Sequence, residues 1–298
     1  MNLPKSNCNR LVLGTAQLGL NYGIANNLGK PDQTMADAIV AEAFENDICE
    51  FDTAQGYGES ETILGRAIVN HRLSKNAGII SKISLELDGI DKSILKDKIL
   101  SSIQKLQVER LYGLMLHRQE QLEMWDNGLG HKLSELVKDG FVKYLGVSVY
   151  TPERALQALN CENLNIIQIP SNILDNRFLD AGVFEKADDL NKTIYIRSVF
   201  LQGLLLMKSL PEKMNFASDY HQKVVLLADE LCISVCELTL WYAREVFPKA
   251  KIVIGVDSPD QLQKNINCWN DTSRRINWST IRRRIGNVPQ RVINPALW

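Results

Sequence analysis

The chain alternates short apolar runs with longer segments in which apolar residues recur every three or four positions. The short runs are apolar at nearly every position, which is typical of parallel strands that are covered on both faces. We predict eight such strands, at residues 10–15, 48–53, 77–83, 111–116, 142–149, 165–170, 193–199 and 251–256.

Helical periodicity fills the intervals between these strands. We predict helices at residues 34–46, 59–71, 92–106, 129–140, 151–159, 182–190, 220–231, 235–247 and 258–269. Two of them begin with explicit start signals, because Thr151 and Ser258 each stand as an N-cap residue before a proline and an acid. Gly140 stands where the C-terminus of a helix favours a glycine.

Eight strand–helix units in series predict an α/β protein with one (β/α)₈ TIM barrel domain over residues 1–298. An open, doubly wound sheet is the alternative, and it would favour a G-x-G-x-x-G turn after the first strand. The chain places Gly14 and Gly19 there at a different spacing, and we expect no helix to start at that point.

Composition narrows the classes of protein that this chain represents. It has 298 residues, of which 45% are hydrophobic, and a net charge of −1, so no overall field attracts nucleic acid or an anionic membrane. No apolar run reaches the roughly 18 residues of a transmembrane helix. The start of the chain lacks an apolar secretory segment, and the six cysteines form no C-x-x-C pair. We therefore expect a cytoplasmic protein with reduced cysteines, as a monomer or homodimer.

Polar residues stand where three neighbouring predicted strands end, which is the face on which barrel enzymes carry their chemistry. Asp52 ends the second strand and Tyr57 follows in a glycine-containing loop, while Lys82 and His117 end the third and fourth strands. Each alone has an ordinary reading, as a turn acid, a lid residue, a surface lysine or a packing histidine. Their joint position at one barrel mouth favours a functional reading.

These four side chains suit general acid–base chemistry on a carbonyl or an alcohol. A phenol has an ordinary pKa of about 10, and a buried ammonium beside it stabilises the phenolate. A carboxylate keeps the lysine charged and oriented, and a histidine can hydrogen-bond a substrate oxygen. The set lacks an activated serine or cysteine, the second carboxylate that glycoside hydrolysis needs, and enough ligands for a metal site. We therefore predict no metal.

The motifs "FDTAQGYG" followed by "E", "ISK", "LMLHR", "KYLGVSVY", "QIPSN", "RSVFLQGLL" and "IGVDSPDQLQKN" resemble the aldo-keto reductase superfamily. The resemblance runs in matching order from about Leu11 to Asn265 and implies a metal-free barrel enzyme that reduces aldehydes or ketones with NAD(P)H. It implies that Tyr57 is the general acid, that Asp52 and Lys82 activate it, and that His117 orients the carbonyl.

The resemblance also implies cofactor contacts along the second half of the chain, at Ser148, Gln168, Arg197, Ser198, Phe200, Gln202, Gly203, Gly255, Asp257, Gln261 and Asn265. Ser148 and Gln168 would hold the nicotinamide carboxamide, although the family's usual asparagine after the serine is replaced by Val149. Arg197 stands where many members place a tyrosine under the nicotinamide ring, and residues 198–203 resemble the loop that holds the pyrophosphate.

The segment after Gly255 departs from NADP-preferring members of that family, which usually carry Arg or Lys there to bind the 2′-phosphate. This chain has Asp257 and Gln261 in that segment, with Lys264 beside Asn265 as a possible cation. A carboxylate would repel a phosphate and could accept hydrogen bonds from a free ribose hydroxyl. We therefore expect use of NAD or of both cofactors.

Candidates for substrate contact are Asn21, Tyr22, Arg291 and Trp298. The resemblance adds a long loop at the mouth after the fourth strand, here residues 118–128 with Trp125. We expect the C-terminal tail, about residues 270–298, to lie over the barrel mouth. The stretches "GTAQLGLNYGIAN" and "NPALW" are similar to members of the family associated with bacterial surface-sugar pathways, which implies a keto-sugar or an activated sugar derivative. The guanidinium groups near the mouth would suit an anionic sugar. The alternative is an NAD(P)(H)-binding regulatory or sensing subunit with slow turnover, since such proteins keep the same four residues.

Overall fold

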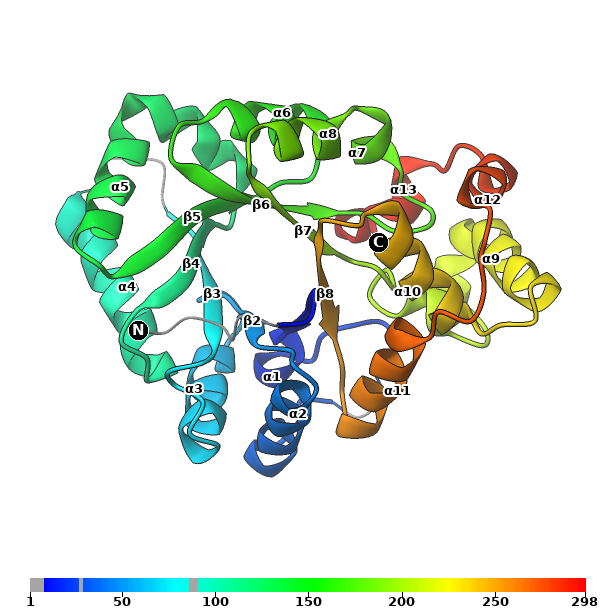
Figure 1. Ribbon diagram of the computed structural model, residues 1–298, viewed down its shortest axis with the longest axis horizontal. Coiled ribbons are helices and arrows are strands. Elements are labelled where there is room, and N and C mark those ends of the chain that lie inside the picture. The colour runs from blue at the N-terminus through cyan, green and yellow to red at the C-terminus, as the bar shows by residue number, and fades with distance from the viewer. Residues whose placement is uncertain (1–7, 27–28, 86–90) are drawn as a thin grey trace.

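A closed barrel of parallel strands forms the centre of the protein in a computed structural model that describes residues 8–26, 29–85 and 91–298 (Figure 1). The strands follow one another in chain order around the barrel: β1 (Leu11–Gly14), β2 (Glu50–Asp52), β3 (Gly78–Ile83), β4 (Leu111–Leu116), β5 (Val142–Ser148), β6 (Leu164–Pro170), β7 (Thr193–Arg197) and β8 (Lys251–Gly255). β1 pairs with both β2 and β8, which closes the sheet. The predicted TIM barrel is confirmed, and the open doubly wound sheet is wrong.

Helices surround the barrel on its outside (Figure 1). Those predicted from periodicity are present with ends shifted by at most two residues: α2 (Gln33–Glu45), α3 (Ser60–Asn70), α4 (Lys92–Leu106), α5 (Gly130–Lys138), α6 (Pro152–Asn160), α8 (Val183–Asp189), α9 (Ser218–Glu230), α10 (Val235–Val246) and α11 (Pro259–Asn270). The start signals act as predicted, because Thr151 Oγ1 accepts from the Arg154 amide and Ser258 Oγ from the Gln261 amide. Gly140 follows α5 with a φ of 84°.

Several short helices were not predicted. A single turn, α1 (Ala16–Gly19), starts directly after β1, so the expectation that no helix starts there is wrong. Four residues are too few to show a helical period, which is why the sequence pattern missed this turn. Further unpredicted helices are α7 (Arg177–Asp180), α12 (Trp278–Ile285), α13 (Gln290–Ile293), the 3₁₀ helices η1 (Gln119–Met124), η3 (Leu204–Leu206), η4 (Glu212–Ala217) and η5 (Pro295–Leu297), and the π-turn η2 (Trp125–Leu129).

The C-terminal tail packs against α9, α10 and the connection that follows β7. Trp278 Nε1 donates to a Glu245 carboxylate oxygen at 2.7 Å, and its ring meets that of Tyr242 edge-on. Farther along the tail, the Arg291 guanidinium lies 4.3 Å from the centre of the Phe216 ring in η4. These contacts anchor the tail beside the loop that leaves the mouth at β7, and its extension over the mouth stays a prediction.

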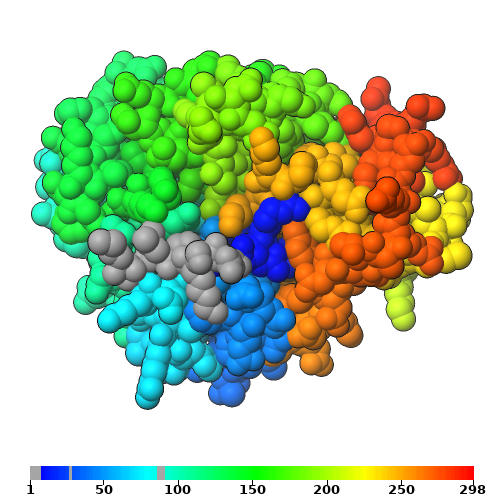
Figure 2. Space-filling model, viewed as in Figure 1, coloured from blue at the N-terminus to red at the C-terminus, as the bar shows by residue number. Residues whose placement is uncertain are grey.

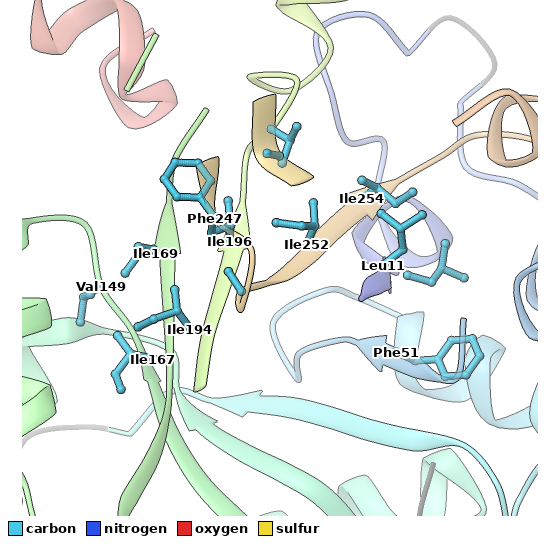
Figure 3. Packing of buried hydrophobic residues seen from close by; sticks show 14 of the residues in the cluster. Leu11, Phe51, Val149, Ile167, Ile169, Ile194, Ile196, Phe247, Ile252 and Ile254 are labelled. Atoms are coloured by element: carbon cyan, nitrogen blue, oxygen red, sulfur yellow. The ribbon is translucent and has the colours of Figure 1, made fainter. Parts of the chain in front are cut away.

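Two apolar clusters hold the barrel together. Leu11 and Leu13 belong to the large cluster between strands and helices, part of which Figure 3 shows, whereas Val12 between them packs inside the barrel. The inner cluster consists of Val12, Ile80, Met115, Ile166, Tyr195 and Val253. The interior below the mouth is therefore filled with side chains and is no pore.

β2 carries a buried carboxylate at each end. Glu50 opens the strand and lies at the lower end of the barrel, where it accepts a 2.5 Å hydrogen bond from the Tyr195 hydroxyl and pairs with Lys251 at 2.8 Å. Asp52 closes the strand at the mouth. Because side chains two residues apart share a face of a strand, both acids point into the barrel. The lower acid is satisfied structurally, which leaves the upper one as the candidate for chemistry.

Among the described residues, no helix has the length and apolar character needed to cross a bilayer. No disulfide joins the cysteines of the described residues; Cys49 and Cys161 are buried, and Cys232 is exposed. The prediction about the start of the chain concerns residues 1–7, which lie outside the described residues.

Candidate active site

A buried ion pair lies at the centre of the barrel mouth. Lys82 Nζ donates to Asp52 Oδ2 at 2.6 Å, and the two side chains expose only 1% and 6% of their surface. Burial alone would lower the pKa of Lys82, but the charges and hydrogen bonds of Asp52 and Tyr57 outweigh it and raise the pKa. Lys82 is therefore a fixed cation at neutral pH.

Tyr57 and His117 complete the group. Lys82 Nζ lies 3.4 Å from the Tyr57 hydroxyl, and the rings of Tyr57 and His117 meet edge-on with centres 5.7 Å apart. The His117 amide donates to Ile83 O at 2.9 Å, which continues the strand pairing by one residue and brings the imidazole to the mouth. The structure thus brings together the four side chains that the strand ends predict.

The imidazole of His117 is held in its neutral form. Burial lowers its pKa to about 4, and the cations of Lys82 and Arg197 act in the same direction, with only Asp52 opposing them. A neutral imidazole can donate or accept a hydrogen bond without carrying charge. At neutral pH this side chain is suited to bind an uncharged oxygen.

Two glycines position the Tyr57 loop. Gly58 has a φ of 57°, and a Cβ added there would lie 2.6 Å from the Gly19 carbonyl oxygen. A Cβ on Gly19 would lie 1.8 Å from the Tyr57 carbonyl oxygen. The unpredicted turn α1 therefore packs backbone against backbone on the tyrosine loop, and only glycine fits at either contact.

A hydroxyl cluster behind Asp52 was missed by the sequence analysis. Ser60 Oγ donates to Thr15 O at 2.7 Å and lies 2.8 and 3.0 Å from the hydroxyls of Thr15 and Thr53. Thr15 Oγ1 in turn donates to the Asp52 carbonyl oxygen at 3.0 Å. These buried contacts join β1, β2 and the start of α3, and they fix the backbone that carries Asp52. Serines and threonines at element ends give no distinctive sequence signal.

Gln168 occupies an unexpected position. Its Nε2 donates to Asp52 Oδ1 at 2.8 Å, so both carboxylate oxygens of Asp52 are engaged, one by Lys82 and one by this amide. Ser148 lies opposite Gln168 in the strand register, and both are buried. The Gln168 Oε1 atom is buried and has no partner among the described residues. It can therefore accept a hydrogen bond from a bound molecule.

A cavity of about 1000 Å³ extends from Asp52 and Tyr57 outward past β7 and β8. This volume is at the upper end of the roughly 300–1000 Å³ of small-molecule and cofactor sites. Except for Ser148 and Gln168, every residue that the resemblance assigns to the cofactor lines it: Arg197, Ser198, Phe200, Gln202, Gly203, Gly255, Asp257, Gln261 and Asn265.

Residues 198–203 form a tightly curled loop along this cavity. Ser198, Leu201 and Gln202 have φ values of 64°, 48° and 54°, a region that non-glycine residues enter at a cost of roughly 1–2 kcal/mol each. Asn172, after β6, donates to Ser198 O at 3.2 Å, and the Ile24 amide donates to Gln202 O at 3.1 Å. The loop is thus held from both sides, and its strained backbone faces the cavity.

The outer end of the cavity carries a carboxylate with an unused oxygen. Asp257 Oδ1 is buried without a partner among the described residues, and burial raises the pKa of this acid against the opposing effect of Gln261. The Gln261 side chain accepts from the Asp257 amide at 2.8 Å, so it caps the start of α11. Lys264 also lines this end and is exposed.

The residues suggested for substrate contact separate in the structure. Tyr22 lines the cavity near Tyr57. Trp125 is buried and donates from Nε1 to Glu162 O at 3.2 Å, so the expectation that it faces the mouth is wrong. Trp298 donates from Nε1 to Arg291 O at 2.8 Å within the tail. In the described part of the chain, no three His, Cys, Asp or Glu side chains group as metal ligands would.

The cavity fits a nicotinamide dinucleotide by its volume and by polar atoms in its lining. Two lining residues carry a buried polar atom that has no partner among the described residues: Arg197 Nη2 at the end of β7 and Asp257 Oδ1 at the outer end. Such atoms are available to hydrogen-bond a ligand. The arrangement combines a proton donor, a fixed cation and a cofactor-sized groove.

Known proteins match both the sequence and the fold. The Aldo/keto reductase family matches residues 10–283. "Uncharacterized oxidoreductase YqkF" of Bacillus subtilis is 24% identical over 295 residues, covering 91% of this chain and 93% of its own. Aldo-keto reductase str7 of Strobilurus tenacellus is 27% identical over 200 residues, and the match spans 65% of this chain and 57% of that protein.

Solved structures share the fold. The aldo-keto reductase AKR11C1 from Bacillus halodurans, in its holo form, superposes with a TM-score of 0.73 at 22% identity, covering 100% of this chain and 96% of its own. The glycerol dehydrogenase AKR11B4 from Gluconobacter oxydans gives a TM-score of 0.71 at 21% identity, with 94% and 92% covered. With the family match over nearly the whole chain, the protein belongs to the Aldo/keto reductase family and is an NAD(P)H-dependent carbonyl reductase.

Proposed function

We propose that Lys82 and the three side chains around it, Asp52, Tyr57 and His117, carry out carbonyl reduction, with Tyr57 as the general acid. The contact between Lys82 Nζ and the Tyr57 hydroxyl, on an ammonium that Asp52 holds at 2.6 Å, carries this proposal. An ammonium in that position stabilises negative charge on the phenolate oxygen. It therefore favours transfer of the phenolic proton to an alkoxide.

Each side chain has a separate task in this scheme. The bound nicotinamide cofactor supplies a hydride to the carbonyl carbon. Tyr57 gives its proton to the carbonyl oxygen, and His117, neutral because its pKa is about 4, hydrogen-bonds that oxygen and sets its direction. Asp52 fixes Lys82, and Gln168 fixes the second oxygen of Asp52.

Replacement of Tyr57 by phenylalanine tests this assignment. Tyr57→Phe removes the proton donor and leaves the cavity, so kcat should fall by about 10²–10⁴-fold while the dissociation constant of the cofactor changes little. Tyr220→Phe, which removes a phenol outside the cavity, is the matched control and should keep full activity. Undiminished turnover by Tyr57→Phe would contradict the role of Tyr57 as the acid.

We also propose that Ser148, Gln168 and residues 198–203 hold the nicotinamide and pyrophosphate, and that Gly255, Asp257, Gln261 and Asn265 hold the adenosine end. The buried, unpartnered Asp257 Oδ1 supports NAD or dual use, because it can accept from a ribose hydroxyl and would repel a 2′-phosphate. Titrations of tryptophan fluorescence with NADH and NADPH should show NADH binding at least as tightly. Asp257→Asn should then improve binding of NADPH relative to NADH; tighter NADPH binding by the wild type would contradict the preference.

For the substrate we propose a polyhydroxylated carbonyl compound such as a keto-sugar or an activated sugar derivative. The name of one structural neighbour, glycerol dehydrogenase, is in keeping with a polyol product. The second candidate, a sensing subunit, keeps the same cavity but predicts slow turnover, so the kcat on sugar carbonyls separates the two. A cytoplasmic monomer or homodimer completes the proposal, and sedimentation of the purified protein tests its assembly state.

A further inference from the structure

Arg197 lines the cavity, and its positive charge has no carboxylate partner among the described residues. None of the ion pairs among the described residues includes it. Within residues 8–26, 29–85 and 91–298, its Nη1 makes only a long hydrogen bond, 3.4 Å, to Ser198 Oγ, and its Nη2 is buried without a partner. Asp52, which lines the inner part of the cavity, is neutralised by its ion pair with Lys82. A net positive charge therefore remains beside the reacting groups.

The guanidinium is held in a fixed plane. Its central carbon lies 4.3 Å from the centre of the Tyr150 ring, at the end of β5, so the ring covers one face. This stacking and the contact with Ser198 limit the orientation of the group and leave its edge as the free hydrogen-bonding side. A guanidinium that is oriented before binding loses little freedom when it takes up an anion.

Arg197 lies close enough to His117 and Tyr22 for its charge to act on both side chains. Its charge helps to keep His117 neutral, after burial and Lys82. Partial burial raises the pKa of Tyr22, and Arg197 opposes that effect. Tyr22, Tyr57 and Arg197 all line the cavity. A molecule with its carbonyl at Tyr57 and His117 would thus have another part within reach of the guanidinium.

We propose that Arg197 is the specificity-determining residue of the substrate site and that it selects carbonyl compounds carrying an anionic oxygen group, a carboxylate or a phosphate. An uncharged substrate would leave Nη2 desolvated and unpartnered, whereas an anionic oxygen satisfies it with a charge-assisted hydrogen bond. This inference rests on the proposed function, since it places the carbonyl at Tyr57.

The test compares 4-carboxybenzaldehyde with its neutral methyl ester, methyl 4-formylbenzoate, in wild type and Arg197→Met. The ratio of kcat/KM values for the acid and the ester is measured in each protein, so differences in intrinsic aldehyde reactivity cancel. We expect the ratio to fall by about 10- to 100-fold in Arg197→Met, mostly through KM of the acid. Arg197→Lys, which keeps the charge but not the planar edge, should retain part of the preference.

Three further measurements separate the explanations. Arg283→Met removes an exposed arginine of α12 and should leave the ratio unchanged. Glyceraldehyde 3-phosphate against glyceraldehyde shows whether phosphate gains more than carboxylate. Calorimetric titration with 4-carboxybenzaldehyde gives its dissociation constant without turnover, so this readout holds even if Tyr57 is not the acid; Arg197→Met should weaken that binding by about 10-fold or more.

Some results would overturn the inference. An acid-to-ester ratio of kcat/KM that is the same in wild type and Arg197→Met would show that the guanidinium does not bind the carboxylate of the substrate. An equal loss on both substrates, together with weaker binding of NADH and NADPH, would assign Arg197 to the cofactor. A wild type that binds the acid but reduces no aldehyde would contradict the proposed function and leave the anion site supported.

Discussion

The Asp52–Lys82 pair offers the sharpest test of how the site is held together, through the variant Asp52→Asn. The wild-type carboxylate accepts from Lys82 Nζ with one oxygen and from Gln168 Nε2 with the other. Asparagine has only one acceptor oxygen, so its amide group must face one of these two donors. The variant therefore loses the negative charge and one of the two hydrogen bonds as well.

The magnitude follows from the burial of the pair. At 2.6 Å and an effective dielectric constant of about 20, the attraction between the two charges is roughly 6 kcal/mol. The asparagine oxygen recovers part of this loss, and removal of one partner of a buried pair commonly costs about 3–5 kcal/mol. Since domains are stable by about 5–15 kcal/mol, Asp52→Asn should fold but should unfold at clearly lower urea concentrations.

The difference in the free energy of unfolding between the wild type and Asp52→Asn should depend on pH. In the wild type the folded pKa of Lys82 is raised, so its stabilising effect is present below the unfolded pKa of about 10.4 and is lost only above it. In Asp52→Asn the Lys82 ammonium has lost its carboxylate partner, so burial becomes the main influence and lowers the pKa of Lys82 in the folded state. The unfolded chain then binds more protons, and the free energy of unfolding of the variant rises with pH until about 10.4.

Urea unfolding of both proteins at pH 7 and pH 9.5, followed by tryptophan fluorescence, measures these two effects. The matched control is Glu59→Gln, because Glu59 forms an ion pair with Lys30 while its side chain is 70% exposed; its unfolding midpoint should stay close to that of the wild type. Unfolding of Asp52→Asn at the wild-type midpoint, or a gap that widens with pH, would refute this reasoning.

Two other substitutions test the surroundings of Tyr57. Gly58→Ala should lower the thermal midpoint more than Gly140→Ala, because both positions have a positive φ but only at Gly58 would the methyl group meet backbone, 2.6 Å from Gly19 O; equal losses would argue against close packing of α1. His117→Gln should flatten the acid side of the stability curve, since the folded pKa of about 4 lies below the ordinary 6.5 and the unfolded wild type binds more protons between these values. An unchanged slope in urea midpoints from pH 6.5 to pH 4 would contradict that assignment.

The sequence predicted those features that depend on periodicity and on strand ends. The barrel, its strands and the meeting of Asp52, Lys82 and His117 follow from one rule, that parallel strands end at a common face. The glycines of the Tyr57 loop were visible as letters, but their partner was not. The turn α1 is too short for a periodic pattern, and its close contact with Gly58 exists only in three dimensions.

Other features depend on side-chain direction, which a sequence does not record. Gln168 lies 116 residues from Asp52 in the chain, and nothing in its neighbours indicates that its amide turns to that carboxylate. Arg197 was expected under the nicotinamide ring, yet its guanidinium stacks on Tyr150, next to a Ser198 whose φ is 64°. Trp125 was expected in a mouth loop because the resemblance implies a long loop after the fourth strand, whereas η1 and η2 form there and the indole is buried.

Because the sheet closes only when its last strand is present, an incomplete chain exposes strand edges that the complete protein does not. A closed barrel has no edge strand, so this sheet offers no row of free backbone groups to another molecule. The last closing partner of β1 is β8, near the end of the chain (Figures 1 and 2, blue beside orange). During synthesis β1 and β7 therefore each lack one pairing partner until Lys251–Gly255 has left the ribosome. Aggregation of this protein should accordingly be a hazard of nascent and C-terminally truncated chains, and shortening the chain before β8 should be far less tolerated than trimming after α13.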